Sequence, residues 1–125
     1  SGIPESVQTL ADQIAGAKAV VISTPEYNKS ISGVLKNALD WVSRAEGSPW
    51  HGKPVAIMSA AAGRAGGERA QFALRLCMRP FKPLILQGAE VLVAASYEAF
   101  GDDGKLISDQ YNTSLDRLMA ALKAA

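Results

Sequence analysis

The stretch Ala19-Val20-Val21-Ile22, followed at once by Ser23-Thr24-Pro25-Glu26-Tyr27-Asn28, decides the fold of this chain. An apolar run this short favours a strand over a helix, and most of its residues are β-branched. Apolar and polar residues do not alternate in it, which is typical of a parallel sheet covered by helices on both faces. The polar segment that follows is therefore expected at the carboxyl end of a buried parallel strand.

Two more runs of the same kind follow, Val55-Ala56-Ile57-Met58 and Val91-Leu92-Val93. Apolar residues recur at helical spacing between and around the runs. This spacing predicts helices from Ile3-Pro4 to Gly16, from about Ser32 to Arg44, from near Gly67 onward, and after Ser108 or Asp109. Pro80 and Pro83 are expected to break the third helix. The alternation predicts one α/β domain over residues 1–125, with right-handed crossovers between parallel strands.

Composition excludes several classes of function. The 13 basic and 12 acidic residues are interspersed, so no run of like charge is available to bind nucleic acid or a membrane surface. No apolar stretch approaches the roughly 20 residues of a membrane-spanning helix. One cysteine, Cys77, and one histidine, His51, are too few for a disulfide framework, a metal site or a thiol hydrolase. We expect a cytoplasmic protein, and its first residues, Ser1-Gly2, are typical of a cleaved tag or a trimmed chain.

The segments that follow the three apolar runs are the candidate site, because ligands of an open parallel sheet lie beyond the carboxyl ends of its strands. In residues 23–30, Pro25 fixes one backbone dihedral, Tyr27 offers a flat amphipathic ring, and Asn28 supplies a donor and an acceptor. A planar heterocycle with a polar edge needs this combination. The alternative is a plain turn from strand to helix, in which Ser30 or Ser32 caps the next helix.

The second segment, residues 59–67, is rich in alanine and glycine, which let the backbone approach a ligand closely. It lacks the ending of a P-loop and the spacing of a dinucleotide fingerprint, and close packing of a helix on the sheet is the simpler explanation. Arg64 and Arg69 are either phosphate ligands or solvated charges at a helix start. His51 has no acidic partner in view, and Cys77 is expected to be a buried, inert thiol.

A family resemblance rests on these residues. Thr24-Pro25-Glu26-Tyr27-Asn28, with Ser30 and the run from Gly33 to Trp41, resembles the signature of the NADPH-dependent FMN reductases, which include chromate, quinone and azo-dye reductases. The similarity continues through Gly52-Lys53-Pro54-Val55 and Gly66-Gly67 to the turn Asp102-Asp103-Gly104-Lys105-Leu106, so it covers essentially the whole chain.

The resemblance implies a flavodoxin-like three-layer α/β/α sandwich with a parallel sheet. It implies that FMN accepts a hydride from NADPH or NADH and passes electrons to a small-molecule acceptor, namely a quinone, a metal oxyanion or an azo compound. The flavin performs the redox chemistry and the protein supplies positioning and electrostatics, so no catalytic side chain is expected. Carried over by position, the residues implied to bind the cofactor are Pro25, Glu26, Tyr27, Asn28, Lys29, Ser59, Ala60, Ala61 and Gly63.

The resemblance also implies a homodimer or a homotetramer. The apolar positions of the second predicted helix fill an arc of about 160°, wider than the roughly 100° that one contact with a core needs. Part of this helix is therefore expected to contact a second subunit.

The chain departs from the family pattern in two ways. It has Ala60-Ala61-Ala62 where relatives often carry hydroxyl side chains, and Lys29 where an aromatic residue is common. The family also begins with a strand and a phosphate-binding loop, and nothing before Ile3 resembles either. The strands are expected to be the third, fourth and fifth of the order 2-1-3-4-5, with an exposed hydrophobic edge. Two alternatives stay open, a flavin-binding electron carrier that does not react with a nicotinamide and an inactive fragment.

Overall fold

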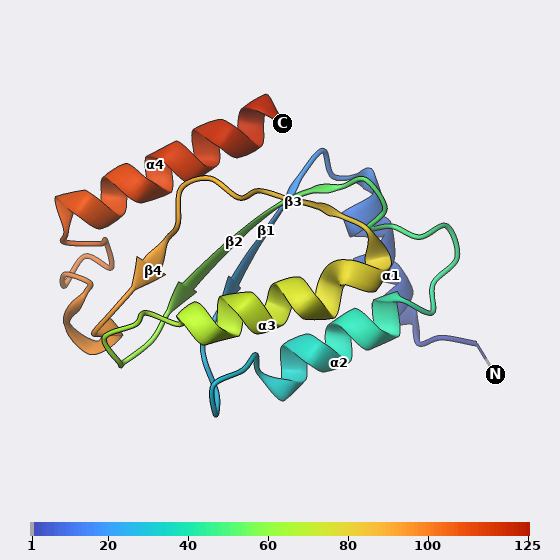
Figure 1. The fold of residues 1–125 in the computed structure, drawn as a ribbon. Coiled ribbons are helices and arrows are strands. Elements are labelled where there is room, and N and C mark those ends of the chain that lie inside the picture. The colour runs from blue at the N-terminus through green and yellow to red at the C-terminus, as the bar shows by residue number, and fades with distance from the viewer. Residues whose placement is uncertain (1) are drawn as a thin grey trace.

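The computed structural model describes residues 2–125, and its elements alternate as the sequence predicts (Figure 1). The helices are α1 (Glu5–Gly16), α2 (Gly33–Val42), α3 (Glu68–Met78) and α4 (Asp109–Ala124), with short 3₁₀ helices η1 (Arg79–Phe81) and η2 (Ser96–Glu98). The strands are β1 (Val20–Thr24), β2 (Pro54–Ala60), β3 (Leu84–Ile85) and β4 (Leu92–Val93). The side chain of Ser32, and not that of Ser30, caps α2 by accepting a hydrogen bond from the amide of Leu35.

The sheet is parallel throughout, and β2 is its central strand. β1 pairs with β2 from Val20 beside Val55 to Thr24 beside Ser59. On the other side of β2, β3 lies beside its start and β4 beside its end, so these two short strands share one position in the sheet. The sheet thus has the three neighbouring positions that the family order predicts.

The strand β3 is not predicted by the sequence pattern. Only two of its residues pair with β2, and they come directly after Pro83, so the pairing leaves no periodicity to detect. The predicted break of the third helix is confirmed, because α3 ends at Met78 and Pro80 lies in η1.

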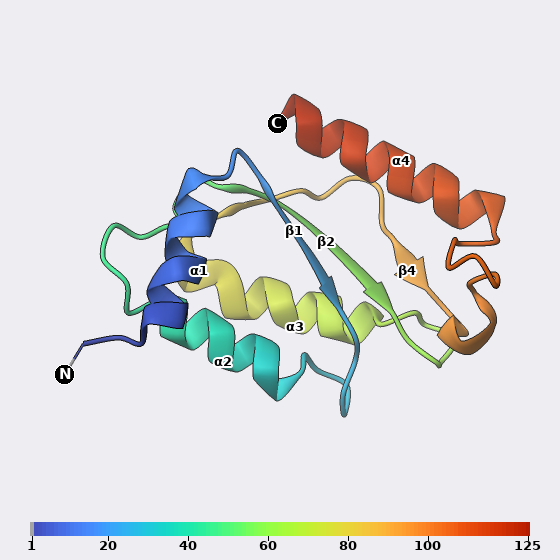
Figure 2. The same cartoon turned by 180° about the vertical axis from the view of Figure 1, so that it is seen from behind.

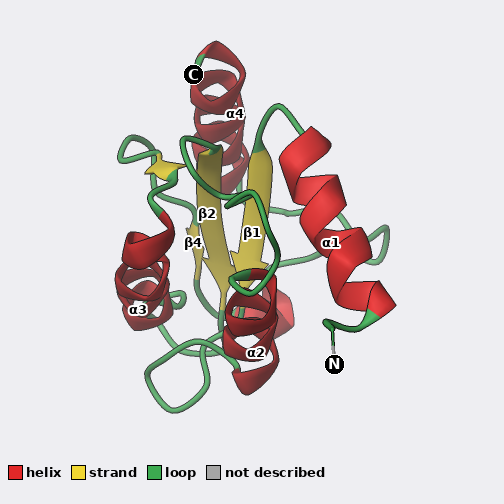
Figure 3. Cartoon of the chain, turned by 90° about the vertical axis from the view of Figure 1, so that its right-hand side faces the viewer, coloured by secondary structure: helices red, strands yellow, loops and turns green. Residues whose placement is uncertain are grey.

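Helices cover both faces of the sheet, which confirms the three-layer α/β/α sandwich. Figures 1 and 2 show α4 alone on one face and α2 and α3 side by side on the other. Figure 3 shows α1 on the same side as α2, next to β1. The first core lies between these helices and the side chains of Val55 and Ile57, and the second core lies between α4 and Ala56. Since α4 is the only helix of residues 2–125 on its face, Val21 of the edge strand β1 is 43% exposed.

Two glycines fix the chain between β2 and α3 against the end of the sheet. Both have left-handed backbone dihedrals, with φ of 64° at Gly66 and 90° at Gly67. A Cβ atom at Gly66 would lie 2.5 Å from the backbone carbon of Leu92, and one at Gly67 would lie 2.7 Å from the side chain of Ser59. No other residue type fits this close approach without moving the loop or β4.

Replacing Gly66 with alanine should therefore destabilise the protein. We expect Gly66→Ala to lower the free energy of unfolding by about 2–4 kcal/mol, through steric overlap and left-handed strain. Gly63→Ala is the matched control, since a Cβ there meets no atom within 4 Å, and it should change stability by less than about 0.5 kcal/mol. Urea unfolding followed by circular dichroism measures both, and equal effects would contradict the packing argument.

Candidate functional site

Three loops leave the sheet at one edge, where the carboxyl ends of the parallel strands meet. They begin after Thr24 of β1, Ala60 of β2 and Val93 of β4, and the register places these residues beside one another. We call them loop 1 (residues 25–30), loop 2 (residues 61–67) and loop 3 (residues 94–96). The three segments that the sequence picked out are thus brought together in space.

Loop 1 is a tight turn. The amide of Tyr27 donates to the carbonyl of Ser30 at 2.9 Å, and the amide of Ser30 donates back to the carbonyl of Tyr27 at 2.9 Å. The two residues between them are left-handed, with φ of 49° at Asn28 and 67° at Lys29. Asparagine tolerates this conformation well, whereas lysine rarely adopts it. The turn leaves the ring of Tyr27 59% exposed, so Tyr27 is not a core residue.

Glu26 lies half-buried between loop 1 and α3. Its Oε1 atom accepts a hydrogen bond of 3.0 Å from the backbone amide of Ala70, in the first turn of α3. The side chain therefore points from the end of β1 toward the helix that follows loop 2.

Loop 2 is held by a buried polar cluster. Ser59 and Gln71 are 2% and 5% exposed. The hydroxyl of Ser59 donates to the carbonyl of Gly66 at 2.5 Å and accepts from the side chain of Gln71 at 2.8 Å. Gln71 also donates to the carbonyl of Val91 at 2.9 Å. Ser59, a predicted cofactor residue, is thus engaged inside the protein, and no pattern of residues in the sequence singled out Gln71.

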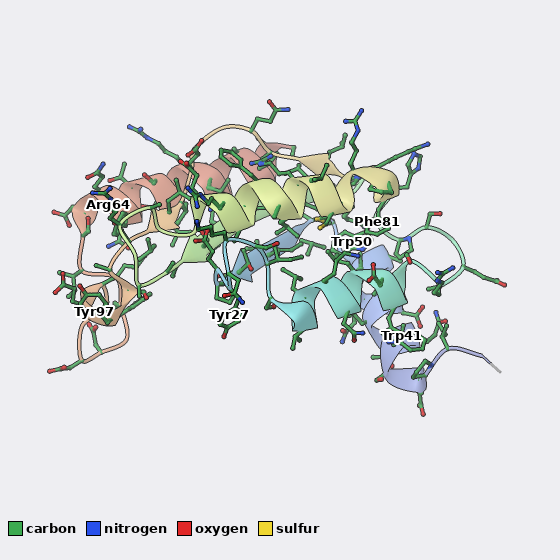
Figure 4. All side chains as sticks on the ribbon, turned by 60° about the horizontal axis from the view of Figure 1, so that its bottom comes forward. Tyr27, Trp41, Trp50, Arg64, Phe81 and Tyr97 are labelled. Atoms are coloured by element: carbon green, nitrogen blue, oxygen red, sulfur yellow. The ribbon has the colours of Figure 1, made fainter. Side chains whose placement is uncertain are left out.

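The start of loop 2 is fastened to loop 3. The amide of Ser96 donates to the carbonyl of Ala61 at 3.0 Å, and the amide of Ala95 donates to the carbonyl of Gly63 at 3.2 Å. Tyr97, which ends the segment that follows the third apolar run, is 77% exposed. Figure 4 shows Tyr27, Arg64 and Tyr97 toward the end of the molecule where the strands finish, and Trp50 and Phe81 toward the other end.

The backbone of loop 2 offers free donors to a ligand. Within the described residues, the amides of residues 62–67 have no hydrogen-bond partner, and residues 62–65 are exposed whereas Gly66 and Gly67 are buried. Such amides can pair with the polar edge of a planar ring, and the small side chains of Ala61, Ala62 and Gly63 do not obstruct them. Tyr27 of loop 1, at the same edge of the sheet, supplies an exposed flat ring. The residues present therefore fit the ring of a flavin, bound in an open setting.

The larger hollows of the described residues lie elsewhere. One of about 710 Å³ is lined by Arg75, Arg79 and Lys82, one of about 640 Å³ by Ile3, Trp41 and Arg44, and one of about 480 Å³ by Trp50, His51 and Phe81. None of these hollows is lined by a residue of loop 1, loop 2 or loop 3.

Four further observations on residues 2–125 concern metal ligands, membrane-spanning helices, His51 and Cys77. No group of three or more His, Cys, Asp or Glu side chains is placed there to hold a metal ion. None of the described helices is long and apolar enough to cross a membrane. His51 is exposed, in agreement with a surface role. Cys77 is only half-buried and packs against the first core, so the expectation of a buried thiol is wrong.

Comparison with known proteins identifies the family. The profile of the NADPH-dependent FMN reductase family matches residues 1–98. The NAD(P)H-dependent FMN reductase of Pseudomonas aeruginosa is 40% identical over 122 residues, which are 98% of this chain and 66% of that protein. The quinone reductase of Escherichia coli is 53% identical over 74 residues, which are 59% of this chain and 39% of that protein.

A solved structure agrees with these sequences. The flavoenzyme NAD(P)H:(acceptor) oxidoreductase FerB of Paracoccus denitrificans superposes with a TM-score of 0.78 at 33% identity, over 97% of this chain and 65% of that protein. This chain thus spans about two thirds of the length of these relatives, 66% and 65% for the two compared over nearly all of it. Because the profile covers most of the chain and the fold is shared, the chain belongs to the NADPH-dependent FMN reductase family.

Proposed function

We propose that this protein is an FMN-dependent oxidoreductase that takes electrons from NADPH or NADH and delivers them to a small-molecule acceptor such as a quinone, a metal oxyanion or an azo compound. FMN, when bound, supplies the hydride and electron chemistry. The observation that carries the proposal is the meeting of the exposed Tyr27 turn and the unpaired amides of loop 2 at one edge of a parallel sheet.

The roles of the chain are binding and electrostatics. Pro25, Tyr27, Asn28 and Lys29 of loop 1 would lie against the ring from one side. The backbone of Ala60, Ala61 and Gly63 would face its polar edge, where amide donors stabilise negative charge. Ser59 would act indirectly, because its hydroxyl is already engaged by Gly66 and Gln71. No side chain serves as a general base in this proposal.

Flavin binding and reduction test the proposal directly. The protein expressed from its complete gene should bind FMN, and NADPH or NADH should bleach the bound flavin until a quinone restores its colour. Retention of no flavin would overturn the proposal. Bound flavin that neither nicotinamide reduces would instead support the alternative, an electron carrier.

Tyr27→Ala should weaken FMN binding. Loss of an aromatic contact predicts an increase in the Kd for FMN of roughly 2- to 10-fold, measured by quenching of flavin fluorescence. Trp41→Ala is the control, because Trp41 is also a partly exposed aromatic residue, 39% exposed, but lies on α2 toward the far end of the molecule (Figure 4). Equal effects of the two substitutions would argue against a ring site at loop 1.

We also propose that the layer of α2 and α3 binds a second copy of this chain. Phe72 and Leu76 lie one turn apart on α3 and are 60% and 73% exposed, and Val34 on α2 is 82% exposed. Apolar side chains this exposed on neighbouring helices are typical of a protein interface. They agree with the wide apolar arc of α2 and with the oligomers that the family resemblance implies.

A cytoplasmic location stays a prediction from composition.

The double variant Phe72→Ser, Leu76→Ser should shift the protein toward the monomer, because it removes apolar area from this layer. Analytical ultracentrifugation across a concentration series measures the shift. The control, Leu84→Ser, changes a similarly exposed residue, 59% exposed, on β3 and should leave the assembly unchanged. A wild-type protein that sediments as a monomer at high concentration would contradict the interface.

A further inference from the structure

The carboxylate of Glu26 forms an unusual helix cap. The N-cap residue of α3 is Gly67, which has no side chain to accept a hydrogen bond from the first turn. Glu26, 44 residues away in sequence, accepts the hydrogen bond of Ala70 instead, at 3.0 Å. A free amide of the first helical turn is thus satisfied by a residue of another loop.

This hydrogen bond joins loop 1 to the start of α3, so it connects two segments of the candidate site. Glu26 belongs to loop 1, and α3 begins where loop 2 ends. The other hydrogen bonds of loop 1 in the described residues are local, between Tyr27 and Ser30 and between Thr24 and the carbonyl of Pro25. Loop 2 is already held by Ser59, Gln71 and loop 3. Within residues 2–125, the bond from Glu26 is therefore the hydrogen bond that attaches loop 1 to the first turn of α3.

The carboxylate of Glu26 also changes the electrostatic potential at the start of α3. The start of a helix carries a partial positive charge, which would favour negative charge on a group bound nearby. The carboxylate of Glu26 offsets this partial charge. Glu68, also in the first turn of α3, adds negative charge there but is exposed, and its side chain makes no hydrogen bond in the described residues.

We propose that Glu26 is a positioning residue, whose carboxylate holds loop 1 to the first turn of α3 and sets the electrostatic potential at the edge of the candidate site. The first part concerns the protein without cofactor. The second part rests on the proposed function, because it concerns the potential of a bound flavin. Glu26 acts on the ring through loop 1 and the helix end, and need not contact the ring itself.

Amide hydrogen exchange of the cofactor-free protein tests the first part. In Glu26→Ala the amides of Tyr27, Ser30 and Ala70 should exchange about tenfold faster, because a hydrogen bond to a charged group is lost between the two segments. Glu26→Gln keeps an acceptor oxygen and should restore most of the protection. The control Glu68→Ala should leave Tyr27 and Ser30 unchanged. Acceleration at Ala70 alone in Glu26→Ala would show a merely local cap and overturn the proposal.

The midpoint potential of bound FMN tests the second part. Glu26→Gln removes a negative charge but keeps the bond, so it should shift the potential to a more positive value while the Kd for FMN stays within about twofold of wild type. Glu26→Ala should raise the Kd as well. An unchanged potential in Glu26→Gln would overturn this part. If the wild-type protein bound no flavin, the proposed function would fail, whereas the exchange experiment would still decide whether Glu26 holds loop 1.

Discussion

The parallel pairing of β1, β2 and β4 is the constraint on which the rest of the structure depends. Because all pairs are parallel, the segments after Thr24, Ala60 and Val93 leave the sheet at one edge. An antiparallel neighbour would send one of these loops to the opposite end. The helices that cover the sheet then serve to hold this register, with Val55 and Ile57 packed on one side and Ala56 on the other.

Loop 2 is held at this edge of the sheet by more hydrogen bonds and close contacts than loop 1. Loop 2 is held by backbone bonds to loop 3, by the Ser59–Gln71 cluster and by two glycines that lie against β2 and β4. Loop 1 is a small turn closed by the hydrogen bonds between Tyr27 and Ser30, and within residues 2–125 the hydrogen bond from Glu26 is the one that joins it to the start of α3. A site built this way presents backbone donors that are already in place, so a planar ligand would not need to order them.

The side chains at the edge explain why the chemistry is assigned to a cofactor. Loop 2 contributes mostly alanine and glycine, and loop 1 contributes a tyrosine, an amide, a lysine and a carboxylate that is already engaged. These groups can position a ring and adjust its electrostatics, but they include no nucleophile paired with a base. For the same reason we do not assign Ser59 a direct contact with the ring. Its hydroxyl already makes hydrogen bonds to Gly66 and Gln71, which hold loop 2.

The sequence by itself determined the four helices and the strands β1, β2 and β4, because short β-branched runs and helical periodicity are local properties of the chain. The order of the sheet was implied by the family resemblance. The sequence also determined the position of the candidate loops, since each directly follows an apolar run. Only the tertiary structure decided that β3 and β4 share one strand position, that Glu26 caps α3, and that Gln71 lies buried against Ser59. These features depend on contacts between residues such as Glu26 and Ala70, which are far apart in the chain, and no local pattern of residue types records which distant partner a side chain will meet.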